Sequence, residues 1–432
     1  MNILVTSGQM QSVGKNQVEF VERKGEGHPD SLSDIIADLF VNNYIKHCWD
    51  KFPLLKSNFK FPNHYADKIN LAGAVSVSKF GSYDIVQPME ALLIGKVTRA
   101  IGHEQINVLS IFQNSVIQGL TEILEQQDIA NNVTYHVKNN DLGGADHGNG
   151  FYNPRSEEEL LNLLEHETLA NDTTVVTSFA PFSVTESLTI YIERTVNSKQ
   201  FKKQFKAIGT DVKVLIVRID KRFDITVCLP FHPEYTPDFN TYSKTLLLVK
   251  SYLEELIYKF LDNQLQSKDY CVDLNINTKD KGEKVYLAPW GTALSKGDCG
   301  VVGRGNKYNG IISVSRPSSV EAPAGKNANH FAGKLYSSVS HSIAHYVFEE
   351  LGLENQTTIS SKNGGVLSEP AYVVVECVNK VDAVQEREIK RIVERELNKL
   401  NEYRIALIYT DPIERFRNGK LDFKQSLLLD SR

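Results

Sequence analysis

Apolar residues recur along much of the chain at the three- and four-residue spacing of an amphipathic helix. This spacing predicts helices over residues 30–45, 241–261, 331–351 and 382–400. Asp30 or Ser31 is suited to cap the first helix, because a short polar side chain can accept a hydrogen bond from a free backbone N–H. Gly352 stands where the third helix should end, since glycine tolerates the left-handed conformation of a C-cap.

Other stretches alternate apolar and polar residues, which is the pattern of a half-buried β-strand. This alternation predicts strands over residues 187–192, 223–229, 371–377 and 405–409. Strand and helix patterns follow one another along the chain without a visible sequence repeat. We therefore predict an α+β fold, built of layers in which each sheet has helices on one face.

The overall charge and composition exclude several classes of protein. The 432 residues include 48 Lys and Arg and 53 Asp and Glu, which gives a net charge of −5. This balance argues against a general nucleic-acid or anionic-membrane partner, although it leaves room for a local basic pocket. No apolar run approaches the roughly 20 residues of a membrane helix. The N-terminus has no signal-peptide pattern, and five widely spaced cysteines include no CxxC pair, so we expect a cytoplasmic protein with free thiols.

Residues 291–334 form the most informative segment of the chain. The segment contains eight glycines, and between Lys296 and Lys334 it contains six basic and two acidic residues. Glycines let the backbone approach a ligand closely, and Lys or Arg supplies charge for phosphate oxygens. The GxxxxGK[ST] pattern of a Walker A loop is absent. The composition leaves two interpretations open, a phosphate-binding loop or a glycine-rich surface loop with solvated charges.

A second segment, VERKGEGHPDS at residues 21–31, places polar groups at the start of a predicted helix. Pro29 suits the first helical positions. His28 could donate a hydrogen bond or a proton to a leaving oxygen, and Asp30 could ligate Mg²⁺. Taken alone, the segment is better explained by a simple helix cap at Asp30 and a surface histidine at His28.

Three other features carry weaker signals. Asn171-Asp172 precedes a β-rich run and is typical of an Asx turn. His341 and His345 are four residues apart on a predicted helix, but the Glu of an HExxH metal motif is missing. Residues 141–155 include four glycines and are expected to form a loop or an insertion.

Taken together and in this order, the motifs resemble methionine adenosyltransferase (S-adenosylmethionine synthetase), and specifically its archaeal-type branch. The resembling segments are VERKGEGHPDS, LANDT followed by FAPFSVTE, DVKVLIVR at residues 211–218, and GDCGVVGRGNKYNGIISVSRP with EAPAGKN at residues 297–327. One GHPDS would be weak evidence, whereas four motifs in order are highly specific.

The resemblance implies a reaction, a fold and an assembly. The family joins ATP and L-methionine by attack of the methionine sulfur on the ribose C5′. It then releases diphosphate and phosphate, with Mg²⁺ ions on the phosphates and usually K⁺. Its fold is three similar α/β domains around a pseudo-threefold axis, for which we expect approximate, interlaced regions 1–150, 151–270 and 271–432. Its sites lie between two subunits, so we expect a homodimer, and the apolar faces of the predicted strands 187–192 and 223–229 could form the interface.

The resemblance also suggests roles for individual residues. His28 resembles the family histidine at the bridging oxygen of the scissile bond, and Asp30 and Asp298 match carboxylates on the Mg²⁺ side. The remaining matches are basic residues on the phosphates and residues in substrate-binding motifs. The basic residues are Lys213, Arg304 and Lys326, and the substrate-binding residues are Asp67, Asp172, Gly303, Gly325 and Lys334.

The sequence departs from the family pattern mainly where methionine would bind. Asn70 stands where an acid is usual, Ala74-Val75 replaces Gly-His, Cys299 replaces an Asp of the archaeal branch, and Ala328 replaces a proline. Two alternatives therefore stay open, a different sulfur acceptor on the same scaffold and a non-catalytic ATP-binding homologue. The sequence does not specify the acceptor, a K⁺ requirement or an oligomer larger than a dimer.

Overall fold

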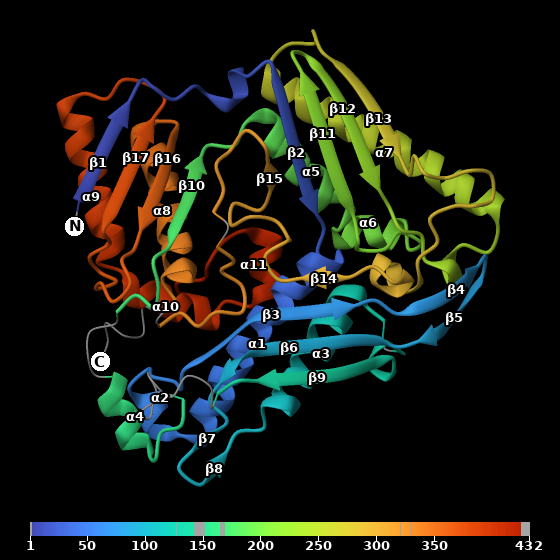
Figure 1. Ribbon diagram of the computed structural model, residues 1–432. Coiled ribbons are helices and arrows are strands. Elements are labelled where there is room, and N and C mark those ends of the chain that lie inside the picture. The colour runs from blue at the N-terminus through green and yellow to red at the C-terminus, as the bar shows by residue number, and fades with distance from the viewer. Residues whose placement is uncertain are drawn as a thin grey trace.

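A computed structural model describes residues 2–126, 128–141, 152–164, 169–319, 321–329 and 331–424. Three mixed β-sheets, each covered by helices, form the body of the protein (Figure 1). The α+β class predicted from the sequence is confirmed. Most of the glycine-rich stretch at 141–155 lies outside the described residues.

The first sheet contains both the N-terminal strand and strands from the last third of the chain. Its order is β1 (Asn2–Ser7), β17 (Tyr372–Cys377), β16 (Asn355–Ser360) and β10 (Val175–Ala180). β1 runs parallel to β17, and the other neighbours are antiparallel. Helices α8 (Ala332–Leu351) and α9 (Ala383–Leu397) bury their apolar faces in the same core as these strands.

The second sheet is built around the strand that leads to the GHPDS motif. Its order is β13 (Cys271–Ile276), β12 (Arg222–Cys228), β11 (Lys213–Ile219), β2 (Val18–Lys24) and β15 (Ile312–Ser313). Helices α5 (Val184–Val196), α6 (Lys199–Gln204) and α7 (Phe239–Leu265) share its core.

The third sheet carries the longest buried helix. Its order is β14 (Gly300–Val301), β3 (His64–Ala72), β6 (Met89–Val97) and β9 (Val133–Asn139). Helices α1 (Pro29–Lys51) and α3 (Val108–Leu124) pack against it.

Smaller elements complete the described fold. Two strand pairs are β4 (Val75–Lys79) with β5 (Ser82–Gln87), and β7 (Ala100–Ile101) with β8 (Glu104–Gln105). The remaining α-helices are α2 (Pro53–Ser57), α4 (Glu157–Leu164), α10 (Leu400–Tyr409) and α11 (Pro412–Asn418). Short 3₁₀ turns occupy Val13–Lys15, Asp128–Asn131, Pro233–Tyr235, Pro289–Gly291 and Ala293–Lys296.

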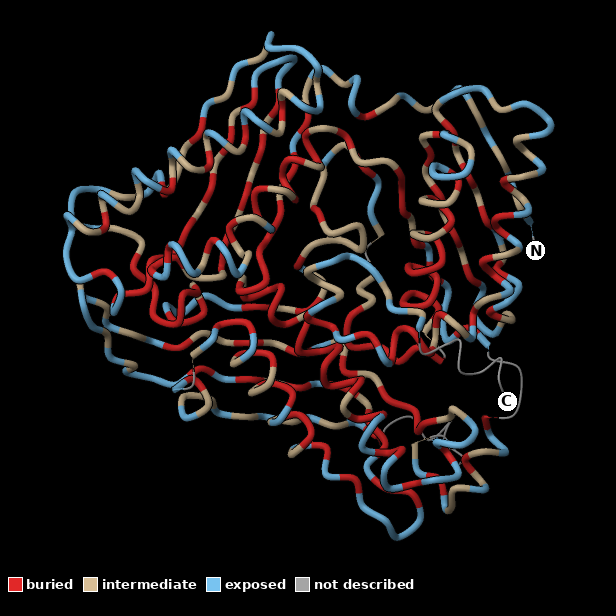
Figure 2. Tube along the Cα trace, turned by 180° about the vertical axis from the view of Figure 1, so that it is seen from behind, coloured by how far each residue is buried: buried red, intermediate tan, exposed pale blue. Residues whose placement is uncertain are grey.

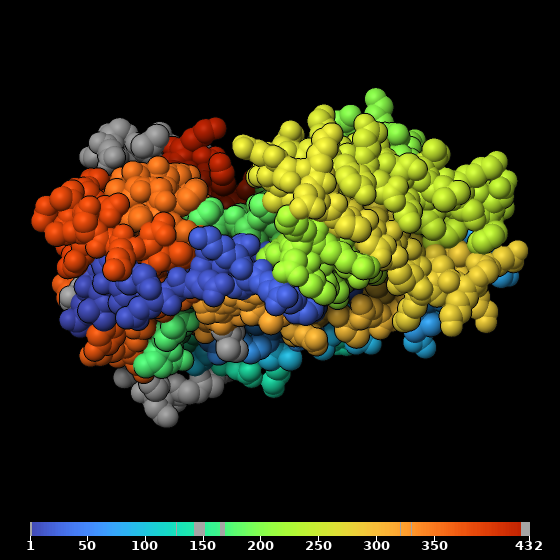
Figure 3. Space-filling view, turned by 90° about the horizontal axis from the view of Figure 1, so that it is seen from above, coloured from blue at the N-terminus to red at the C-terminus, as the bar shows by residue number. Residues whose placement is uncertain are grey.

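The three sheets are interlaced along the chain. The first sheet takes strands from residues 2–7, 175–180 and 355–377, while the second begins at residue 18 and ends at residue 313. Seen from above, the N-terminal segment in blue crosses from the orange and red part to the yellow and green part (Figure 3). Residues far apart in sequence therefore meet where the sheets adjoin.

Most of the predicted elements occur at the expected places. The helices predicted over 30–45, 241–261, 331–351 and 382–400 are α1, α7, α8 and α9, and the strands over 223–229 and 371–377 are β12 and β17. Helix α8 ends at Gly352, whose φ of +66° is the left-handed C-cap conformation.

Two predicted strands are wrong, because both segments are helical. Residues 187–192 lie in α5, which begins at a capping box between Ser183 and Glu186. Residues 405–409 lie in α10, where four consecutive residues, 405–408, are buried. Both helices are buried around much of their circumference, so alternate positions are apolar without a strand being present. The interface expected on 187–192 therefore has no strand there, and the apolar face of 223–229 is not free for a partner either, because Phe223, Ile225 and Val227 are buried in the core of the second sheet.

The cap of α1 also differs from the prediction. His28, and not Asp30 or Ser31, is the N-cap, and its ring accepts a hydrogen bond from the backbone N–H of Asp30. Seventeen of the 23 residues of α1 are buried, which places this helix in the interior (Figure 2). Polar side chains on α1 must therefore find partners inside the protein.

Two expectations about cysteines and membranes can be compared with the structure. All five cysteines lie within the described residues, and all are free. Among the described helices, none combines the length and apolar character that crossing a bilayer requires.

Candidate active site

Three carboxylates on α1 hold the glycine-rich segment along the helix. Asp30, Asp34 and Asp38 are four residues apart and share one face of α1. Each accepts a hydrogen bond from a backbone N–H of the segment: Val301 to Asp30 at 3.0 Å, Gly303 to Asp34 at 2.8 Å and Gly325 to Asp38 at 2.9 Å. These bonds fix residues 301–325 over two turns of α1, so the glycine-rich segment is not a free surface loop.

The approach of this segment to α1 is close enough to require glycine. A Cβ added at Gly300 would lie 2.0 Å from the backbone oxygen of Pro29. Any larger residue at this position would push β14 away from the first turn of α1. Close packing against α1 therefore requires glycine at this position, whether or not a ligand contacts it.

His28 is a neutral hydrogen-bond donor at the start of α1. Burial, reinforced by the positive charge of Lys24, lowers the pKa of His28 to about 4. Its Nδ1 accepts the N–H of Asp30 at 3.2 Å, so in the neutral ring the proton is on Nε2. The Nε2–H group can therefore donate a hydrogen bond to a ligand at neutral pH without any change in protonation.

Charged groups from three separate segments surround His28. Lys24, Asp30, Lys213 and Asp298 all act on its pKa. Four predicted residues from three separate motifs therefore come together in one place: His28, Asp30, Lys213 and Asp298.

Lys24 was not among the residues predicted for the site. Its Nζ donates to Asp30 Oδ2 at 2.9 Å and to the backbone oxygen of Arg304 at 2.7 Å. The antiparallel register of β2 and β11 places Lys24 directly opposite Lys213, which pairs with Glu22 at 3.0 Å. Lys24 belongs to the VERKGEGHPDS motif, and its place at the end of a strand before His28 was the signal that could have identified it.

The carboxylates near His28 fit a cation that arrives with phosphate. Both Asp30 oxygens are bonded, to Lys24 and to Val301, whereas Asp298 is exposed and one of its oxygens accepts the N–H of Cys299 at 2.9 Å. Burial, with a smaller contribution from the charge of Asp298, raises the pKa of Asp211 to about 7, although the carboxyl accepts the N–H of Ala293 at 2.8 Å.

Within the described residues, no group of three or more His, Cys, Asp or Glu side chains is placed to hold a metal by itself. Mg²⁺ usually binds through one or two carboxylates together with substrate phosphates. The donor set at Asp298 therefore fits Mg²⁺ bound jointly by protein and nucleotide.

Three other predicted residues meet in a second place, a cavity of about 440 Å³. Asp67, Asp172 and Lys326 line it together with Glu321, which was not predicted. Lys326 Nζ lies 3.8 Å from Asp67 Oδ2 and forms an ion pair with Glu321. Among the described residues, the buried Oδ1 of Asp67 has no hydrogen-bond partner. This side of the cavity therefore has an acceptor available for a ligand.

The remaining predicted residues hold the segment between these two places. Lys334 is buried and donates to Asp38 at 2.5 Å, the same carboxylate that binds Gly325. Gly303 binds Asp34, and the exposed Arg304 follows it on the loop. Asp34 and Asp38 were not predicted, although their four-residue spacing from Asp30 was visible in the sequence.

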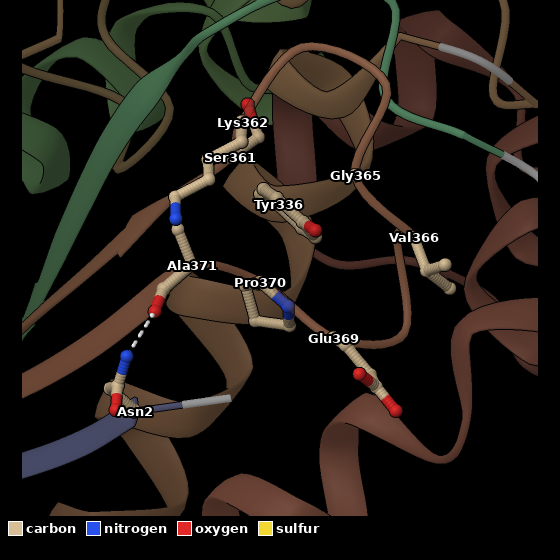
Figure 4. Close-up of a pocket in the computed structure, with 9 residues that line it drawn as sticks. All are labelled: Asn2, Tyr336, Ser361, Lys362, Gly365, Val366, Glu369, Pro370 and Ala371. Atoms are coloured by element: carbon tan, nitrogen blue, oxygen red, sulfur yellow. Dashed lines mark hydrogen bonds between the residues drawn. The ribbon is translucent and has the colours of Figure 1, made fainter.

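A smaller cavity of about 190 Å³ contains none of the predicted residues (Figure 4). It lies beside Asn2, whose side chain donates to the backbone oxygen of Ala371 at 3.2 Å. Ser361, also on its wall, donates to the backbone oxygen of Asp172 at 2.7 Å. Ser361 therefore supports the LANDT motif, residues 169–173, from outside the larger cavity.

His341 and His345 stack on α8 with ring centroids 4.1 Å apart. Burial lowers the pKa of His341 to about 3, so this ring is neutral. Tyr308 packs against the His341 ring edge-to-face, at 5.5 Å. Both side chains are partly buried, and His345 Nδ1 lies 2.9 Å from the backbone oxygen of His341.

The protein is thus an α+β protein of three interlaced sheets, and lysine and carboxylate side chains gather at the start of its buried helix α1, as in a candidate active site. A family model described as S-adenosylmethionine synthetase (AdoMet synthetase) matches residues 1–411. The chain therefore belongs to the S-adenosylmethionine synthetase family, and both the resemblance and the enzyme class predicted from the motifs are confirmed.

Individual proteins agree with this assignment. The chain is 32% identical over 424 residues to the S-adenosylmethionine synthase of Aeropyrum pernix, covering 95% of this chain and 98% of that protein. It is 30% identical over 419 residues to the enzyme of that name from Hyperthermus butylicus, with 93% and 96% covered. It is also 31% identical over 384 residues to an uncharacterised protein of Streptococcus pyogenes serotype M3, with 88% and 90% covered.

A solved structure shares the fold. The structure of an unusual S-adenosylmethionine synthetase from Campylobacter jejuni aligns with a TM-score of 0.56 at 15% identity, covering 93% of this chain and 95% of that one. At this identity the likeness concerns the fold alone.

Proposed function

We propose that the protein transfers the adenosyl group of ATP to the sulfur of L-methionine, forming S-adenosylmethionine and triphosphate, and that water then hydrolyses the triphosphate to diphosphate and phosphate. The observation that carries the proposal in detail is His28, a neutral donor held at the start of α1 between two lysines. This arrangement suits a reaction in which negative charge develops on a leaving oxygen.

The chemistry needs positioning more than acid–base catalysis. A lone pair of the methionine sulfur forms the S–C5′ bond as the C5′–O5′ bond breaks, and the electron pair of that bond leaves with the triphosphate. Sulfur is already a nucleophile, so no general base is required. His28 Nε2–H donates a hydrogen bond to the leaving oxygen, and Lys213 and Arg304 attract the phosphates.

We place Mg²⁺ at Asp298, with Asp30 and Asp211 nearby, where it would be shared with the phosphates. When bound, Mg²⁺ neutralises charge on the triphosphate. Asp30 remains bonded to Lys24 and Val301 and holds this lysine in position beside His28. A K⁺ requirement rests on the family resemblance alone.

We propose that the larger cavity binds L-methionine. Its mixture of charges suits a zwitterion, because Lys326 can bind the carboxylate while Asp67 and Asp172 bind the ammonium group. The rings of Tyr65 and Phe331, which also line the cavity, offer contacts for a thioether. This assignment moves Lys326 from the phosphates, where the motif resemblance put it, to the amino acid.

The spacing of the two places along α1 supports this assignment. Asp30 and Asp38 are separated by eight residues, or about 12 Å along the helix axis. Asp30 lies beside His28 at the first end, and Asp38 binds Gly325, which directly precedes Lys326, at the second end. The proposed roles of Gly303, Gly325 and Lys334 are to hold the segment between both ends.

We also propose that two copies of the chain pair and that this pairing completes both active sites. We further propose that the three sheet units are related by approximate threefold symmetry. The second sheet supports pairing, since its face opposite α5 and α7 carries exposed apolar residues, with Phe20 44% and Val314 79% exposed. Lys213 lies on this face, so a partner there would lie beside the site. As the resemblance implies, we assign the protein to the cytoplasm.

The direct test is incubation with ATP, Mg²⁺ and L-methionine, followed by mass spectrometry for S-adenosylmethionine and assays for diphosphate and phosphate. We expect all three products, and none without Mg²⁺. Hydrolysis of ATP to phosphate without a methionine adduct would instead favour a different sulfur acceptor. Light scattering across a dilution series, with activity measured at each concentration, tests the dimer, and a fully active monomer would refute it.

A further inference from the structure

Helix α11 reaches both ends of the candidate site, although it lies near the end of the described chain. It begins at Pro412, one residue after the last residue that the family model matches. Figure 1 shows α11 near the middle of the molecule, and Ile413 is buried in the same core as α1. Three consecutive side chains, residues 415–417, then contact the segment that carries His28.

The first contact leads to Lys326. Arg415 forms an ion pair with Asp38 Oδ2, while Asp38 Oδ1 accepts Lys334 Nζ at 2.5 Å and the N–H of Gly325 at 2.9 Å. Asp38 is 2% exposed, so its charge depends on these partners. Gly325 directly precedes Lys326, which means that the position of Asp38 controls the backbone from which Lys326 enters the cavity.

The second contact leads to His28. Arg417 Nε donates to Glu26 Oε2 at 2.6 Å, and Glu26 is buried two residues before His28. Burial raises the pKa of Glu26, and Arg417 is the principal group opposing that rise. The GEG segment is tight, because a Cβ at Gly27 would lie 2.3 Å from the hydroxyl oxygen of Thr210. A shift of Glu26 would therefore be transmitted to His28.

The residue between the two arginines holds α11 against β2. The ring of Phe416 lies under the guanidinium of Arg23, whose central carbon is 5.2 Å from the ring centroid. Arg23 is itself buried and donates to Glu193 at 2.5 Å. The contact places α11 between β2 and α1, so its two arginines reach both elements at once.

We propose that α11 is a positioning clamp, in which Arg417 sets His28 through Glu26 and Arg415 sets Lys326 through Asp38 and Gly325. The two arginines are positioning residues, since neither touches the proposed substrates. The inference rests on the proposed function, which assigns His28 to the leaving group and Lys326 to methionine. The inference adds that helix α11, which follows the residues matched by the family model, aligns His28 and Lys326 with each other.

The test uses single variants of the full-length chain. Arg417→Met keeps much of the side-chain volume and removes the charge, and Arg417→Lys restores charge without the planar guanidinium. For Arg415, which pairs with the buried Asp38, the milder Arg415→Lys is used, so that the protein keeps a charge opposite Asp38. Arg391→Met on α9 is the matched control, because Arg391 is an exposed arginine that pairs with Glu388 at 2.7 Å.

The clamp predicts a different kinetic effect for each arginine. Arg417→Met should lower kcat by roughly tenfold or more with KM for methionine little changed, since displacing a catalytic group by about 1 Å costs up to roughly a hundredfold. Arg417→Lys should recover part of this loss. Arg415→Lys should raise KM for methionine several-fold while KM for ATP stays near wild type, and Arg391→Met should behave as wild type.

A second measurement separates the clamp from the proposed function. The histidine ring resonances of wild type and Arg417→Met are compared by NMR, with His28 assigned from a His28→Gln variant. A changed chemical shift of the His28 ring supports the clamp even if no S-adenosylmethionine forms. The lack of product would then refute only the proposed function. A lowered melting temperature with unchanged His28 resonance and unchanged kinetics would overturn the clamp and leave α11 as a structural brace.

Discussion

Ionisation of the Asp34 carboxyl should lower the free energy of unfolding as the pH rises. Burial, together with the charges of Asp38 and Asp30, raises the pKa of Asp34 to about 7, against an ordinary value of 3.8. The folded protein therefore holds this proton over a range in which the unfolded chain has lost it. Stability from this group is complete below about pH 4 and falls as the pH rises to about 7.

The magnitude follows from the difference between these two pKa values. At 1.36 kcal/mol for each pKa unit, the difference between 3.8 and about 7 corresponds to about 4 kcal/mol in the free energy of unfolding. Asp34 keeps partial contact with solvent, which screens the charge, so we expect about half of this value, roughly 2 kcal/mol. Asp34→Asn should remove the pH-dependent loss, because the amide oxygen can still accept the N–H of Gly303 but carries no charge.

The assay is urea unfolding of wild type and Asp34→Asn at pH 4, 6 and 8, at one fixed protein concentration because pairing of subunits would add to stability. The variant should match wild type at pH 4 and exceed it by about 2 kcal/mol at pH 8. Asp84→Asn, at an exposed position on β5, is the control and should follow wild type at every pH. A difference that stays constant across this range would refute the reasoning.

Three further predictions follow from the site and its packing. His28→Ala should lower kcat by roughly 10²–10³, the effect of losing a preorganised donor, with an unchanged circular dichroism spectrum; an unfolded spectrum would indicate a structural role. Lys326→Met should raise KM for methionine roughly tenfold or more and KM for ATP much less, whereas equal increases would return Lys326 to the phosphates. Gly300→Ala should destabilise by roughly 1–3 kcal/mol in urea, because its Cβ would meet the oxygen of Pro29 at 2.0 Å, while Gly14→Ala, with its nearest contact at 3.8 Å, should change little.

Local patterns were sufficient where a helix or strand has one buried face. Helices α7 and α9 and strands β12 and β17 occur where their periodicity placed them, because the core covers only one side of each. The same reasoning failed for α5 and α10, which are buried on several sides. Over a five- or six-residue stretch of such a short helix, alternating apolar positions are compatible with a strand as well, whereas the buried helices α1 and α8 are long enough to show the helical spacing.

The sequence alone indicated the family and several residues that the structure brings together. Motif types and their order resembled those of the S-adenosylmethionine synthetase family, and this resemblance, not the composition of the glycine-rich segment, pointed to phosphate chemistry. His28, Asp30, Lys213 and Asp298 do meet in the structure. Which groups surround them could not be predicted, since Lys24 faces Lys213 only through the register of β2 and β11.

Only the tertiary structure decided how the two parts of the site are separated and held. Asp30, Asp34 and Asp38 bind backbone groups about 270 to 290 residues further along the chain, and Arg415 returns to Asp38 from near the C-terminal end. A buried carboxylate must be paired, but its charge and local sequence do not specify which distant N–H or guanidinium will pair with it. That choice follows from how three interlaced sheets pack, which depends on contacts across the whole chain.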